Sequence, residues 1–181
     1  MSESLSPAPP AAPATGPQAE FVPGWLRLML IVAAVIEAFQ ALPALSVFFG
    51  DLKEVPGPGF GGTLIAITIA AKALLALAAI MAAIKHQIRG AILAMACIVL
   101  ASWLSDLPSL TKQDMAFKGG IYINAYMLYR IIACPFIVAI SGTLAIKNER
   151  LKFAAILACL PTFIGLLGIF AFAIGIAIYG F

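Results

Sequence analysis

The chain has 181 residues, of which 63% are hydrophobic and only 10% are charged, with a formal net charge of +3. Soluble domains carry about 25% charged residues, so this composition is typical of an integral membrane protein and leaves no room for a soluble catalytic domain. The few charges between apolar segments indicate membrane topology and argue against nucleic-acid binding, and three scattered cysteines with one histidine predict neither a metal site nor a bound cofactor.

The apolar segments predict an all-α fold, an integral membrane bundle of five transmembrane helices. Residues 1–24 are rich in proline, alanine and serine and lack apolar periodicity, so we expect a disordered cytoplasmic tail. Residues 25–181 form the transmembrane domain, with predicted spans at about 25–49, 62–84, 91–107, 121–146 and 153–179. The third span is the shortest, because Asp106 and Pro108 lie at its end.

Basic residues decide which side of the membrane each loop faces. The short connections KHQIRG (85–90) and KNERLK (147–152) are basic, and Arg27 stands on the same side at the start of the first span. Positively charged loops stay in the cytoplasm, so the N-terminus is predicted to be cytoplasmic in a bacterial-type inner membrane. Five spans then place the C-terminus outside.

The second and fourth spans are similar in sequence. A Gly-Gly pair ends ten residues before Lys72 and another ends ten residues before Arg130, and both spans finish in Ala-Ile-Lys, at 83–85 and 145–147. One interpretation is an internal repeat, in which two parallel helical hairpins, spans one–two and three–four, precede a fifth helix. The alternative is chance similarity among helices that are rich in alanine, leucine and glycine.

Four charged residues fall within or at the end of the spans, and a charge at the membrane centre costs about 2.5–3.5 kcal/mol unless it is paired. Helical rise places Glu37 at the depth of Lys72, with Gln40 on the Glu37 face, and Asp106 at the depth of Arg130. We therefore expect two ion pairs. Their role is open: structural pairs that fix helix register, a protonatable Glu37 with an anion bound by the two cations, or a lipid-headgroup or quinone site.

The fifth span carries four small residues in a narrow sector of its surface: Gly165, Gly168, Ala171 and Gly175. Small residues let membrane helices approach closely, so we predict a helix-contact face. Its partner is another part of the chain, a second copy or a different protein.

The chain contains no nucleotide-binding loop, metal motif or nucleophile motif, so we expect no enzymatic activity. The function that these features favour is an accessory, assembly or scaffold subunit of a larger membrane complex. Its partners would be the lipid bilayer and other membrane subunits or further copies of itself. The alternative is a small transporter or channel that uses the charged residues near the middle of the membrane; a membrane enzyme acting on lipid or quinone is a weaker third.

Overall fold

The computed structural model describes residues 23–45, 60–112 and 121–179. In these ranges the chain forms helices and no strand: α1 (Gly24–Ala44), α2 (Phe60–Ile84), α3 (Ile88–Lys112), α4 (Ile121–Leu128), the π-helical segment η2 (Tyr129–Ala133), α5 (Cys134–Lys147) and α6 (Leu151–Tyr179). Since α4, η2 and α5 are continuous, the described residues contain five helices long and apolar enough to cross a membrane. The predicted all-α, multi-pass membrane bundle is confirmed.

Helix boundaries differ from the predicted spans mainly in the third. Helix α3 begins three residues before the predicted start and continues five residues past the predicted end, through Asp106 and Pro108. Proline is tolerated in membrane helices because neighbouring groups satisfy the carbonyl that it leaves free. Helix α1 begins at Gly24, the last residue of the predicted tail; the tail up to residue 22 and the predicted end of the first span, 46–49, lie outside the described residues.

The five helices close into a ring. Helix α1 packs against α2, α2 against α3, α3 against α5, α5 against α6, and α6 against α1. Helix α3 also contacts α1 and α6 and has the largest buried share of the five, 44% against 22–33% for the others. The span with the least clear sequence is therefore the centre of the bundle, where charges on it meet several neighbours.

Small side chains make this packing close. Alanine dominates the shared core, with examples on three helices at Ala33, Ala79 and Ala154. In lipid there is no hydrophobic force between helices, so close backbone approach through small residues stabilises the contact instead. Larger apolar side chains such as Phe39 and Leu74 are exposed on the outside of the bundle, and in a membrane they face lipid.

The two short turns between helices have the same backbone geometry. His86 and Asn148 both adopt the left-handed conformation, with φ of 60° and 59°. Each donates its N–H to the carbonyl three residues earlier, at 3.3 and 3.2 Å, and the following residue donates to the carbonyl five residues earlier, at 2.8 and 2.9 Å. These are Schellman helix ends. The Ala-Ile-Lys sequence before each turn thus ends a helix in the same way at both places.

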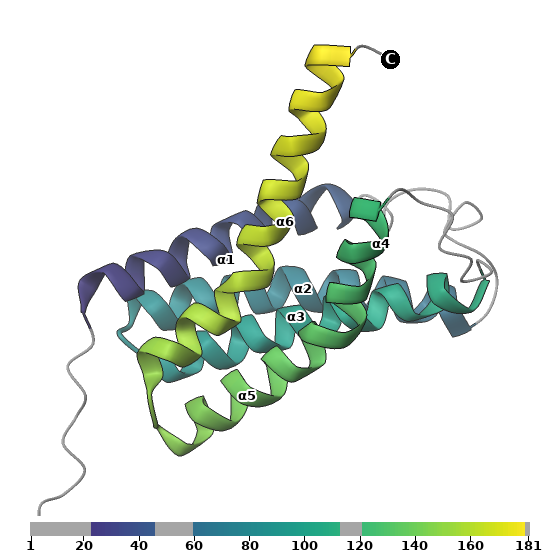
Figure 1. The fold of residues 1–181 in the computed structure, drawn as a ribbon. Coiled ribbons are helices and arrows are strands. Elements are labelled where there is room, and N and C mark those ends of the chain that lie inside the picture. Colours follow the sequence, from purple (N-terminus) through teal and green to yellow (C-terminus); the bar gives the residue numbers. More distant parts are fainter. Residues whose placement is uncertain (1–22, 46–59, 113–120, 180–181) are drawn as a thin grey trace, which may run out of the picture.

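Arg27 ties α1 to the first of these turns. Its Nη2 donates to the Ile84 carbonyl at 3.3 Å and its Nη1 lies 3.2 Å from Nε2 of His86. A cation at the C-terminal end of a helix also interacts favourably with the helix dipole. The start of α1 and the turns at 85–87 and 148–150 lie at the same end of the bundle (Figure 1), which we call the basic end. Arg27 belongs to this end through its contacts with Ile84 and His86.

Helix α6 leaves the bundle in its second half. It crosses the other helices and then projects beyond them, and α4 turns away from the line of α5 on the same side (Figure 1). From Leu167 to Ile178 every residue of α6 is exposed except Gly175, which is half-buried. The first half of α6 therefore builds the bundle, and the second half has an apolar surface without a neighbour in the described chain.

Candidate functional site: a cavity between two ion pairs

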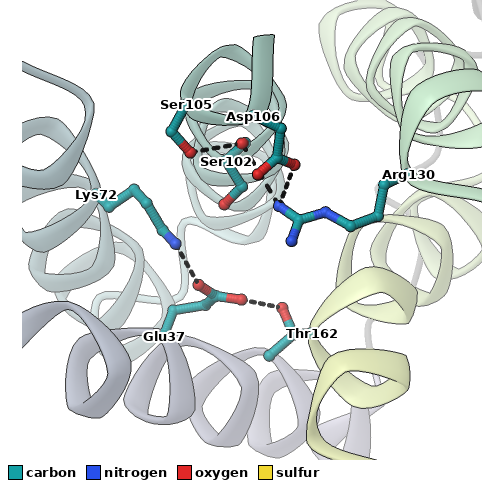
Figure 2. Close-up of polar contacts among 7 residues, drawn as sticks. All are labelled: Glu37, Lys72, Ser102, Ser105, Asp106, Arg130 and Thr162. Atoms are coloured by element: carbon teal, nitrogen blue, oxygen red, sulfur yellow. Dashed lines mark hydrogen bonds and ion pairs between the residues drawn. The ribbon is translucent and has the colours of Figure 1, made fainter. Parts of the chain in front are cut away.

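The four charged residues of the spans form two ion pairs, as the sequence analysis expects. Lys72 Nζ on α2 lies 3.8 Å from Glu37 Oε2 on α1, and Arg130 Nη2 in η2 lies 2.5 Å from Asp106 Oδ2 on α3. The two pairs face the same region between the helices (Figure 2). Asp106 also lies within electrostatic range of Lys72, so the two pairs form one cluster.

Glu37 is held from two sides in different ways. Its Oε1 accepts a 2.7 Å hydrogen bond from the Thr162 hydroxyl on α6, whereas its Oε2 accepts none, because Lys72 is beyond hydrogen-bond distance. Glu37 is buried, with 7% of its surface exposed. One carboxylate oxygen is thus fixed by α6 while the other remains available to a donor that approaches from the Lys72 side.

Arg130 is anchored to α3. Besides the contact with Asp106, its Nη2 donates to the Ser102 carbonyl at 3.5 Å, and its guanidinium lies 5.8 Å from the centre of the Tyr126 ring. Cation–π contacts of this length add a modest attraction. Arg130 therefore has three partners, the nearest at 2.5 Å, whereas Lys72 has one ion-pair partner at 3.8 Å.

The π-helical segment that carries Arg130 is explained by Pro135. Proline has no N–H to donate to the carbonyl four residues earlier, that of Ile131, and its ring crowds that carbonyl. Trp103 on α3 satisfies the free carbonyl by donating its indole Nε1–H at 3.3 Å. π-helical turns are frequent at functional sites, so the irregular backbone at η2 makes this segment a candidate part of a functional site. Pro135 therefore shapes the turn that carries Tyr129 and Arg130.

One cavity lies among these groups, with about 550 Å³ of empty space including its open mouth. Its lining combines charged, hydroxyl and aromatic side chains from several helices: Glu37, Gln40, Lys72, Val99, Ser102, Trp103, Tyr126, Tyr129, Arg130, Cys134, Pro161, Thr162 and Gly165. The part of this space that a water-sized molecule can occupy is about 100 Å³, which is below the range of about 300–1,000 Å³ typical of drug-sized ligand sites and suits a small solute. Asp106 is not among the lining residues, although it contacts Arg130.

The cavity sits at one level of the bundle because three helices face it in the same register. Glu37 on α1, Val99 on α3 and Thr162 on α6 each lie eleven residues after the first buried residue of their helix, and all three line the cavity. The helical period brings the same face back after three turns. Because the buried part of α1, α3 and α6 begins at the basic end in each case, residues eleven positions further along lie at the same distance from that end.

Tyr129 adds an unpaired polar group to this lining. Its hydroxyl is buried and has no hydrogen-bond partner among the described residues, and its ring centre lies 6.4 Å from that of Tyr126. A buried polar group without a partner costs about 1–3 kcal/mol. A ligand in the cavity that accepts this hydrogen bond would recover part of that cost.

The structure separates the predicted helix-contact face of α6 into two parts. A Cβ at Gly165 would lie in ordinary van der Waals contact with the Tyr126 hydroxyl, at 3.9 Å, so this residue lies beside α4, and it borders the cavity. At Gly168 and Gly175 a Cβ would meet nothing within 4 Å, and Ala171 is exposed. Among the described residues, a neighbour within 4 Å of the Cβ position is found at the Gly165 end of the stripe and not at Gly168 or Gly175.

Sequence reasoning did not single out Thr162, Ser102 or Trp103 for this site. Thr162 follows Pro161 within an apolar stretch, and Trp103 lies inside a span rather than at its edge, where tryptophan usually anchors a helix. A lone polar residue deep in a span is a weak signal, because serine and threonine can bond to their own helix backbone. Here Thr162 bonds to Glu37 instead.

Among the described residues, no three His, Cys, Asp or Glu side chains come together as metal ligands would. Comparison with known protein families, with curated proteins and with solved structures finds no match to this chain.

Proposed function

We propose that the protein is a small transporter of a bacterial-type inner membrane that binds a polar solute in the cavity between its ion pairs. The observation that carries this proposal is the shared cavity: all five membrane-spanning helices contribute charged or hydroxyl side chains to one space. Ionisable residues inside a membrane that face a cavity typically mark a solute or proton pathway. The 3.8 Å separation of Lys72 from Glu37 also favours binding, because a purely structural pair gains most from direct contact.

The orientation follows from the basic residues. Lys85, Arg89, Lys147, Arg150 and Lys152 belong to the two short turns at the basic end. The positive-inside rule supports a cytoplasmic basic end and N-terminus, with the C-terminus outside.

An internal repeat is part of this proposal. It is supported by the Schellman turns that follow Ala-Ile-Lys at both 83–85 and 145–147, and by the common register of α1, α3 and α6. Many transporters are built from parallel repeats with the substrate site near the membrane midplane. In this chain α1, α3 and α6 would be copies of the first helix of the repeat. Helices α2 and α5 would be copies of its second helix.

The accessory or scaffold subunit remains the second candidate, and the projecting half of α6 favours it. Residues 167–178 present an apolar helix with Gly168 and Gly175 open to close approach by another helix. In this function the ion pairs hold the bundle together and the cavity carries no solute.

Flux in proteoliposomes tests the proposed transporter. The wild-type protein is expected to move at least one member of a panel of radiolabelled anions, zwitterions, cations and neutral solutes. The double variant Glu37→Gln with Lys72→Met removes both charges without stranding either, so it should fold and lose flux. Lys152→Met, the same change at an exposed position, should retain it.

The outcome separates the two candidates. If the wild-type protein moves no solute in the panel and carries a stoichiometric membrane protein through purification in mild detergent, the scaffold function replaces the transporter. Equal flux in the wild-type and double-variant proteins would show that the ion pair has no part in the pathway.

A further inference from the structure

We infer that the cavity binds a small organic monoanion between Lys72 and Arg130, and that Glu37 takes up one proton as the anion binds. This inference rests on the proposed solute site and names its substrate class. Three observations carry it: the charge of the lining, the supply of hydrogen-bond donors, and the charge balance of the cluster.

The lining of the cavity is positive. Lys72 and Arg130 both border it, whereas Glu37 is its single carboxylate, because Asp106 contacts Arg130 from outside the lining. Two cations and one anion leave one formal positive charge facing the space. Asp106 makes the whole cluster neutral but is not among the lining residues, so an anion in the cavity meets attraction from the two cations that line it.

Donors around the cavity also exceed acceptors. Lys72 makes no hydrogen bond within the described chain, since its one contact is the 3.8 Å ion pair, and the Tyr129 hydroxyl has no partner there. The Gln40 side chain also lines the cavity, and its amide NH₂ group is a further hydrogen-bond donor. A carboxylate offers two strong acceptor oxygens and would satisfy Lys72 and Tyr129 together. The Val99 side chain and the Trp103 and Tyr126 rings give the rest of the lining an apolar character that suits an organic body.

Charge balance then requires a proton. The cluster of Glu37, Lys72, Asp106 and Arg130 has a formal charge of zero, and adding a monoanion makes it −1 in a poorly solvated region. Binding one proton from water to the Glu37 carboxylate, which becomes the neutral acid, restores zero charge. Anion and proton would therefore bind together, and moving both across the membrane would transfer no net charge.

Glu37 is the acceptor of this proton on geometric grounds. Glu37 lines the cavity and its Oε2 lies 3.8 Å from Lys72, whereas Asp106 is outside the lining and its Oδ2 lies 2.5 Å from Arg130. The other titratable or charged groups around it are Lys72 from α2, Asp106 from α3, and Tyr126, Tyr129, Arg130 and Cys134 from the helix that contains η2. From α6 the contacting group is Thr162, which does not titrate.

Three ligands of the same shape test the charge preference: benzoate, benzamide and benzylamine in its cationic form. Benzoate should bind the purified wild-type protein in detergent most tightly of the three by isothermal titration. Lys72→Met and Arg130→Gln should each weaken benzoate binding about 10- to 100-fold, the range for loss of a charged hydrogen bond. Lys152→Met should bind as the wild type does.

The proton is tested separately. Benzoate affinity should rise by up to about tenfold per unit fall in pH, because one proton binds with each anion. Glu37→Gln should bind benzoate with no pH dependence. If this variant does not fold, the wild-type protein still provides the test: benzoate added in weak buffer with a pH indicator should cause uptake of about one proton per anion bound.

The outcomes distinguish this inference from the proposed function. Preferred binding of benzamide or benzylamine, or flux of cations or neutral solutes only, overturns the anion site and leaves a transporter. Benzoate binding without proton uptake overturns the role of Glu37. Absence of flux for every solute class removes the transporter and this inference with it.

Discussion

At the scale of single residues, the cluster is asymmetric. Arg130 has a direct ion pair with Asp106, a backbone acceptor on α3 and an aromatic neighbour, whereas Lys72 has one long contact to Glu37. Glu37 in turn relies on the Thr162 hydroxyl. The better-held pair fixes the register between η2 and α3, and the looser pair is the part of the cluster that can rearrange around a ligand.

Lys72→Ala should destabilise the protein by leaving the Glu37 carboxylate buried without a countercharge. We expect a loss of up to about 3 kcal/mol, the lower end of the range for breaking a buried pair, because the contact is long. Adding Glu37→Ala should recover part of this loss, since the double variant leaves no unpaired charge. Thermal unfolding of the two variants in one detergent measures the difference. A double variant less stable than or equal to Lys72→Ala would show that the two residues are not coupled.

At the scale of elements, the π-helical segment η2 links the backbone to the site. Pro135 frees the Ile131 carbonyl, Trp103 captures it, and the widened turn sets where Tyr129 and Arg130 enter the cavity. The adjoining helix α3 supplies both acceptors of Arg130. The geometry of the site therefore depends on one proline as much as on the charges.

Pro135→Ala should shift this geometry without unfolding the helix. The restored N–H can donate to the Ile131 carbonyl, so η2 is expected to relax toward α-helical form and to turn Arg130 away from Asp106. Stability should stay equal or rise, by at most about 3 kcal/mol. Flux should fall at least tenfold. Thr143→Ala, an exposed change elsewhere on α5, is the control. Full flux in Pro135→Ala would mean that the π-helical turn does not position the site.

Sequence predicted the elements and the ion pairs for simple physical reasons. A bilayer fixes the length of an apolar helix, and a charge in lipid needs a partner at its own depth, so Glu37 with Lys72 and Asp106 with Arg130 followed from helical rise. It did not predict that the two pairs meet at one cavity. That depends on α3 contacting all four other membrane-spanning helices, and helices with apolar residues on all sides do not reveal which face is buried.

At the scale of the whole molecule, the bundle has small residues inside, large apolar residues outside and one polar cavity within. The arrangement suits a lipid environment, where the outer surface needs no polar groups. The projecting half of α6 does not share this arrangement, because this segment neither encloses the cavity nor packs on the bundle (Figure 1). The cavity and the projecting segment thus support different functions, solute binding and association.

Water access to the cavity tests the central claim most directly, because a sealed structural cluster and a solute site differ in this property. In a chain whose cysteines at 97, 134 and 159 are replaced by alanine, Ser102→Cys places a thiol in the cavity lining and Leu74→Cys places one on the lipid-facing side of α2. Thiolates react with charged methanethiosulfonate reagents in water and not in lipid. In native membranes, we predict labelling of the cysteine at 102 and none at 74. No labelling at 102 by a reagent added to either side of the membrane would contradict the account.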